Sequence, residues 1–223
     1  MFKKTLIIML GVLFLASQSF AARPLTTDDA GIVEKGTFEL ERGYDYTKNQ
    51  NNTESQTTGL SLKHGLTDRL DFGLAFPYEI KPNKGLGSAE LGVKFSLLKE
   101  KEGLPGLSST FSYQVGALAY TLNMILSKGF GSLTCHLNIG FEATGQVTER
   151  GITTYSGAVE YSAIKENLNL VAEVMGNEDN LLMGLIGTNF QAFKGVTSDI
   201  GLQFGFNNDS PKSGLTIGLT TEF

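Results

Sequence analysis

Apolar side chains alternate one by one with polar or small side chains along most of this chain. In residues 132–142, Leu133 and Ile139 fall on one set of alternate positions and His136 on the other, and residues 214–223 repeat the pattern up to the final Phe. Successive side chains of a β-strand point to opposite faces. Each such segment therefore predicts a strand with one apolar and one polar surface.

Turns and loops rich in Gly, Asn, Asp and Pro separate the alternating segments, and these residues suit tight connections. Most segments are near the ~9 to 11 residues with which a tilted strand crosses a membrane. An even number of strands places both chain ends on the periplasmic side, with tight turns there and longer polar loops opposite. The pattern predicts twelve strands, at about residues 38–46, 59–64, 70–79, 88–97, 110–116, 120–127, 132–142, 153–163, 168–175, 181–190, 199–206 and 214–223.

The polar face of these strands carries many charges, which distinguishes between two classes of β-protein. A β-sandwich needs an apolar core, whereas a membrane barrel has a wet interior. We therefore predict an all-β, transmembrane, antiparallel up-and-down β-barrel of about twelve strands, with a sandwich or a lipocalin-like barrel as alternatives. The predicted lumen-lining residues, which are candidates for controlling selectivity, are Glu39, Glu41, Lys63, Asp71, Glu90, Lys94, His136, Glu142, Glu160 and Glu173.

Two places depart from the simple pattern. Arg42 falls on the apolar face of the first strand. A bulge near Arg42, or a side chain that extends to the membrane interface, would accommodate it. Residues 181–190 are apolar on both faces, so their register is ambiguous.

The start of the chain predicts export. Lys3 and Lys4 precede a short apolar run, and Ser19 and Ala21 supply the small residues that a cleavage site needs. We predict a signal peptide at residues 1–21, an extended N-terminal segment at 22–35 and a barrel domain at 36–223. The expected location is the outer membrane of a Gram-negative cell, with outer-membrane lipid around the barrel.

The chain ends on Phe223, at the close of an alternating strand. This end resembles the signal by which bacterial outer-membrane barrels are recognised for assembly. The resemblance implies that Phe223 is an assembly signal and that the barrel-assembly machinery is a partner.

A second resemblance is carried by two motifs near the start of the predicted barrel. These are the run from Arg23 to Gly31, RPLTTDDAG, and the run from Gly36 to Glu41, GTFELE, with support from HGLTDRL at residues 64–70. With these motifs, the chain resembles the outer-membrane family named for the MetA pathway of phenol degradation. The resemblance implies a porin-like channel or transporter, and it does not imply phenol as the solute.

Motifs for catalysis, metals or cofactors are nearly absent from the sequence. The two histidines are His64 and His136, and no paired-cysteine or HExxH motif occurs. A hydrolase would need a nucleophile, a base and an orienting group, and His136 with Ser132 or Asn138 is the one set that the pattern offers. We therefore expect no enzyme activity, no cofactor, no metal and no nucleic-acid partner.

The expected function is passive or selective uptake of small solutes, with hydrophobic or aromatic compounds among the candidates. A structural barrel whose lumen is plugged is the alternative, and an outer-membrane hydrolase is a weaker one. Seven carboxylates against two lysines in the lumen-lining set predict a modest preference for cations or neutral solutes over anions.

Overall fold

The computed structural model describes residues 23–146, 149–165 and 167–223, and the predicted signal peptide lies outside the described residues. No helix in these parts of the chain is long and apolar enough to cross a membrane. The described strands are β1 (Phe38–Lys48), β2 (Glu54–Thr67), β3 (Leu70–Lys81), β4 (Gly85–Leu86), β5 (Glu90–Leu98), β6 (Gly106–Gln114), β7 (Tyr120–Phe130), β8 (Leu133–Ala143), β9 (Ile152–Ile164), β10 (Leu168–Asn177), β11 (Leu182–Phe193), β12 (Val196–Gly205) and β13 (Ser213–Glu222).

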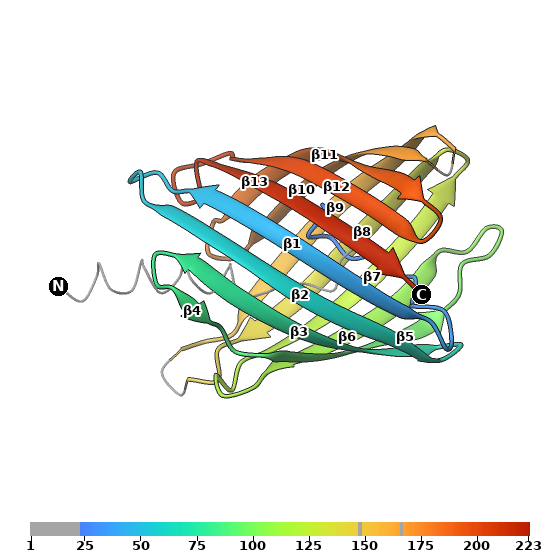
Figure 1. Ribbon diagram of the computed structural model, residues 1–223, viewed down its shortest axis with the longest axis horizontal. Helices are drawn as coiled ribbons and strands as arrows, with labels where there is room; N and C mark the ends of the chain where they lie inside the picture. Colours follow the sequence, from blue (N-terminus) through green and yellow to red (C-terminus); the bar gives the residue numbers. More distant parts are fainter. Residues whose placement is uncertain (1–22, 147–148, 166) are drawn as a thin grey trace.

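The strands close into a barrel, because β1 pairs with β2 on one side and with the last strand, β13, on the other. The pairing of β1 with β13 runs from Glu39 opposite Glu222 to Lys48 opposite Ser213, and every neighbouring pair in the ring is antiparallel. Strand β4 is a two-residue addition that pairs only with β3, so the ring itself has twelve strands (Figure 1). The predicted barrel is confirmed, and the closed ring excludes the sandwich.

The alternation of the sequence becomes two different surfaces of the wall. On β8, Leu137 and Ile139 are exposed on the outside, whereas His136 and Asn138 are buried inside. Large exposed apolar side chains occur in the same way on strands all around the ring. The outside of the barrel is therefore apolar, and the inside is polar.

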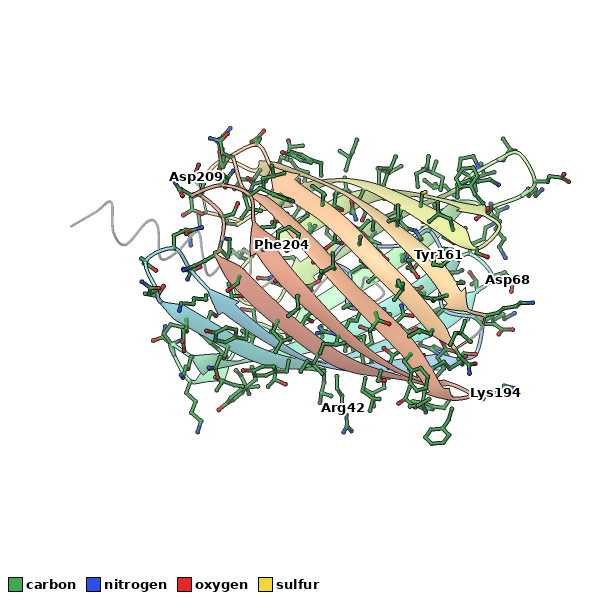
Figure 2. The ribbon with its side chains drawn as sticks, turned by 90° about the horizontal axis from the view of Figure 1, so that it is seen from above. Arg42, Asp68, Tyr161, Lys194, Phe204 and Asp209 are labelled. Atoms are coloured by element: carbon green, nitrogen blue, oxygen red, sulfur yellow. The ribbon has the colours of Figure 1, made fainter. Side chains whose placement is uncertain are left out.

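The two ends of the barrel differ. Short turns at residues 68–69, 131–132 and 194–195 lie at the end that carries the C terminus, which we call the turn end. Gly131 and Gly195 adopt positive φ angles of 67° and 74°, which glycine tolerates in tight turns. Loops at residues 49–53, 144–151 and 206–212 lie at the other end, the loop end. Figure 2 shows Asp68 and Lys194 together at one end and Asp209 at the other.

The structure settles both irregular places. Arg42 pairs with Leu60 and Leu219 without a shift of register, so the bulge proposed near Arg42 is wrong. Its side chain is exposed and points away from the wall (Figure 2). In β11, Met183 and Leu185 are buried inside and Ile186 is exposed outside, which fixes the register that the sequence left ambiguous.

Candidate functional site

Residues 23–35, which we call the lumen segment, lie inside the barrel (Figure 1). The segment joins β1 at the turn end, where Lys35 forms an isolated bridge with Gly65 of β2. From there it crosses the interior to Arg23, which reaches β1, β12 and β13. The sequence predicts an extended segment here, and the structure adds that the segment is enclosed by the barrel.

The backbone of the lumen segment is held by side chains of the wall. The Val33 amide donates to Asp71 at 2.9 Å, and the Ala30 amide donates to the Ser127 hydroxyl at 2.8 Å. Ser108 donates to the Ala30 carbonyl at 2.6 Å. A buried backbone group needs a hydrogen-bond partner, and a segment without a paired strand finds those partners on the wall.

Asn138 and Glu173 hold the next part of the segment. The Asp28 amide donates to the Asn138 side-chain oxygen, and the Asn138 side-chain nitrogen donates to the Asp28 carbonyl, both at 2.8 Å. The Glu173 carboxylate accepts hydrogen bonds from the amides of Thr26 and Thr27. Two inward side chains, one from β8 and one from β10, therefore hydrogen-bond to the backbone of the segment.

A buried ion pair joins the segment to β5. Lys94 Nζ lies 2.8 Å from Asp28 Oδ1, and both side chains are almost fully buried. Burial raises the pKa of the Asp28 carboxyl to about 6, although the charge of Lys94 acts in the opposite direction. Ions taken out of water are costly unless they are paired, so each of these two charges depends on the other.

Arg23 ends the described part of the segment in a niche of the wall. Its guanidinium lies 3.2 Å from Asp45 and 3.6 Å from Asp199, and it also donates to the Thr216 hydroxyl. The guanidinium occupies the space that a Cβ would take at Gly43 or Gly218. Glycine at these two inward positions therefore makes room for Arg23.

An apolar cluster seats the neighbouring residue, Leu25, which is 4% exposed. The cluster also comprises Ala158, Val171, Met175, Met183 and Leu185. These side chains come from β9, β10 and β11 and point inward. The both-sided apolar pattern of residues 181–190 thus supplies part of the seat for Leu25.

The other predicted lumen-lining residues form two groups. Lys63 Nζ lies 2.7 Å from Glu39 and 3.0 Å from Glu41, which ties β1 to β2 inside the wall. Glu90 and Glu142, at the loop end, make no ion pair among the described residues. The structure therefore joins Asp71, Lys94 and Glu173 to the lumen segment, whereas Glu90 and Glu142 make no hydrogen bond or ion pair with its described residues.

His136 belongs to a separate chain of contacts. His136 Nδ1 lies 2.7 Å from the Ser127 hydroxyl, and His136 Nε2 lies 3.3 Å from the Glu160 carboxylate. This resembles the order of groups in a hydrolase, but the Ser127 oxygen already accepts the Ala30 amide. The structure joins His136 to Ser127 and Glu160 rather than to Ser132 or Asn138, and Asn138 instead binds Asp28 and lines the loop-end cavity described below.

Cavities remain within the described part of the barrel, and two of them bear on function. One, of about 80 Å³, lies at the loop end, and Thr26 and Asp28 of the lumen segment form part of its lining. The rest of its lining comprises Glu90, Thr110, Ser112, Thr121, Asn123, Asn138, Glu142, Thr154, Tyr155, Ser156, Met175 and Gly176. The other, of about 280 Å³, lies at the turn end and is lined by Ser162, Asn167, Asn169, Asn189, Gln191 and Thr197.

Sequence reasoning did not assign roles to Arg23, Asp28, Asp45 or Asp199. One signal was present, because Arg23 and Asp28 lie in the motif at residues 23–31 that carried the family resemblance. A charged motif outside the alternating strands needs partners, and the inward side chains of the strands are those partners.

No family model matches this chain, and no curated protein matches it. Among solved structures, the KdgM porin has a TM-score of 0.67 at 9% identity over 83% of this chain and 99% of that chain. An outer membrane channel from Pseudomonas putida F1 has a TM-score of 0.65 at 14% identity over 89% of this chain and 100% of that chain. The NanC porin has a TM-score of 0.59 at 10% identity, with 82% of this chain and 98% of that chain covered. In its fold, the chain is therefore a twelve-stranded antiparallel barrel of the kind found in outer-membrane porins.

Proposed function

We propose that this protein is an outer-membrane channel for small solutes whose lumen is narrowed by its own N-terminal segment. The observation that carries the proposal is the closed wall with an apolar outside and a charged, polar inside. Such a wall satisfies its backbone hydrogen bonds around the ring and places polar groups only where water reaches them. In this proposal the loop end faces the cell exterior and the turn end faces the periplasm.

The chemical class of solute is part of the proposal. Similar barrels differ in this respect, since the KdgM porin forms a complex with disordered oligogalacturonate and TodX is a monoaromatic hydrocarbon channel. Hydrophobic or aromatic solutes remain candidates for this chain. The polar lining of the turn-end cavity supports small polar solutes as well.

The family named for the MetA pathway of phenol degradation remains our proposed family. Its support is the RPLTTDDAG motif, which forms most of the lumen segment. Arg23, Leu25 and Asp28 of this motif each have a separate seat on the wall. A motif with so many specific contacts is difficult to replace, which fits a segment with a set place in the lumen.

A structural barrel without transport is the second candidate, and the same segment favours it. The lumen segment is hydrogen-bonded or paired to strands on every side of the interior, from β2 to β13. Single-channel recordings of the refolded barrel in a planar bilayer distinguish the two candidates. Discrete current steps support the channel, and an electrically silent barrel supports the structural role.

The first prediction concerns location and assembly. The predicted signal peptide and the apolar outer wall should bring the protein to the outer membrane, where lipid covers that wall. Cell fractionation should recover it there, and the unheated protein should migrate faster than the boiled protein on a detergent gel, because a closed barrel stays compact. Recovery as a soluble periplasmic protein would contradict the proposal.

The second prediction concerns ion selectivity. Lys63 is engaged by Glu39 and Glu41, and Lys94 by Asp28, whereas Glu90 and Glu142 have no basic partner among the described residues. A low-dielectric wall focuses the field of such charges onto passing ions. The open pore should therefore favour cations, and Glu90→Gln with Glu142→Gln should shift the reversal potential in a salt gradient towards anions. Anion selectivity of the unmodified pore would show that these side chains do not set the field.

A further inference from the structure

The loop-end cavity has an unbalanced charge. Three of its lining residues are acidic, Asp28, Glu90 and Glu142, and none is basic. The Asp28 carboxylate is met by Lys94, which lies 2.8 Å away and is not part of the lining. The charge that remains without a basic partner is that of Glu90 and Glu142.

Glu90 and Glu142 are placed where they affect each other. Glu90 is 4% exposed, lies opposite Gln114 of β6 and lines the cavity together with Ser112. The charge of Glu142 acts unfavourably on that of Glu90. The side chain of Glu142 is half-buried and has no hydrogen bond or ion pair within the described chain. A cation between two like charges at the edge of a low-dielectric wall reduces their electrostatic repulsion.

The rest of the lining indicates what kind of cation fits. Thr110, Thr121, Thr154 and Ser156 offer hydroxyls, and Asn123 offers an amide, so a ligand with its own hydroxyl finds both donors and acceptors. A cavity of about 80 Å³ is well below the ~300 to 1,000 Å³ of drug-sized sites. The ligand is therefore a small molecule or one terminal group of a larger one.

A metal ion suits this cavity less well. Calcium takes six to eight oxygen ligands and magnesium demands a near-ideal octahedron. Within residues 23–146, 149–165 and 167–223, no three His, Cys, Asp or Glu side chains come together in a group that could hold a metal ion. The hydroxyl-rich lining serves an ammonium group with an attached hydroxyl better than a bare divalent ion.

We propose that the loop-end cavity binds a small hydroxylated organic cation, such as a protonated amino alcohol, with its ammonium group between Glu90 and Glu142. The hydroxyl of the ligand then meets the Thr and Ser side chains, and Thr26 and Asp28 of the lumen segment form the end of the cavity. This site proposal rests on the proposed channel function. It makes that function more specific, because it names the class of solute that binds first at the loop end.

The test is equilibrium binding to the refolded full-length barrel in detergent, measured by calorimetry. Three probes of similar size separate charge from shape: ethanolammonium is cationic, ethylene glycol is neutral and glycolate is anionic. Ethanolammonium should bind saturably at one site, whereas ethylene glycol and glycolate should bind at least about tenfold more weakly, because neither can donate charge-assisted hydrogen bonds to the carboxylates.

Matched variants locate the binding. Glu90→Gln with Glu142→Gln should weaken ethanolammonium binding about tenfold or more. Glu54→Gln with Glu178→Gln makes the same change of charge at the exposed loop end outside the cavity and should leave binding unchanged. Glu142→Gln alone serves as a mild variant, since this side chain makes no hydrogen bond within the described chain, and migration of unboiled protein on a gel verifies folding of each.

Several outcomes would overturn the proposal. Equal binding of glycol would show a neutral polyol site, tighter binding of calcium with displacement of ethanolammonium would show a metal site, and equal loss in both variant pairs would show a diffuse surface field. The proposed channel function fails separately, if binding is found while the bilayer recordings stay silent. Current steps without ethanolammonium binding would support the channel function and exclude this binding site.

Discussion

Removal of residues 23–34, with the chain joined from Ala22 to Lys35, should raise the single-channel conductance several-fold. The lumen segment fills the interior and is fastened to it by Asp71, Asn138 and Glu173. In the proposed channel, removal of the segment leaves a wider path through which ions cross in water. Single-channel recordings on variant barrels that pass the gel test for folding provide the measurement, and unchanged conductance would show that ions take a path that the segment does not obstruct.

A smaller change tests the same idea without shortening the chain. Lys94→Met leaves the buried Asp28 carboxylate unpaired, which costs roughly 3 to 5 kcal/mol in comparable buried pairs. This variant should release the segment for part of the time and give a second, higher conductance level. Combining it with Asp28→Asn removes both charges, so the double variant should return towards the unmodified conductance.

Deletion of Phe223 should sharply lower the amount of folded barrel while leaving the conductance of each assembled molecule unchanged. The Phe38 amide donates to the Phe223 carbonyl at 2.8 Å, and the Phe223 amide donates back at 3.0 Å. The rings of Phe38 and Phe223 stack with centroids 5.8 Å apart, and Phe38 also stacks on His64 at 4.0 Å. The residue therefore closes the seam between β13 and β1, outside the lumen.

Substitutions at Phe223 separate recognition by the assembly machinery from closure of the seam. Phe223→Ala keeps the backbone pair and loses the ring, whereas Phe223→Tyr keeps an aromatic ring. Phe206→Ala removes a comparably exposed ring beyond the loop end of β12 and should assemble normally. If Phe223→Ala refolds normally in detergent but fails in cells, the ring is an assembly signal. Normal levels of the deletion variant in cells would rule out both roles.

The wall of the barrel was predictable because its information is local and periodic. On β8, His136 and Asn138 alternate with Leu137 and Ile139, and this is sufficient to predict a strand and its two faces. A bulge was only one of the two explanations left open for Arg42, because alternation alone does not show how a strand accommodates a charge on its apolar face. The structure retains the register, since a long side chain carries its charge away from an otherwise regular strand.

The lumen segment was less predictable because its contacts are not periodic. Arg23 pairs with Asp45 and Asp199. These two residues lie far apart in the sequence and come together only when β1 meets β13. The alternation placed Asn138 and Glu173 on the inward face, but it gave no sign of what they bind. A closed ring is needed before these side chains surround a common space.

The inward glycines beside the lumen segment affect the width of the barrel interior. Gly43 and Gly218 leave the wall bare next to Arg23, and Gly187 and Gly201 do the same next to Pro24. The wall contributes no side chains at these positions, and Arg23 and Pro24 of the lumen segment take up part of the space that is left. Replacement of the lumen segment by a different sequence would therefore change the width of the proposed pore without a change in any strand of the barrel.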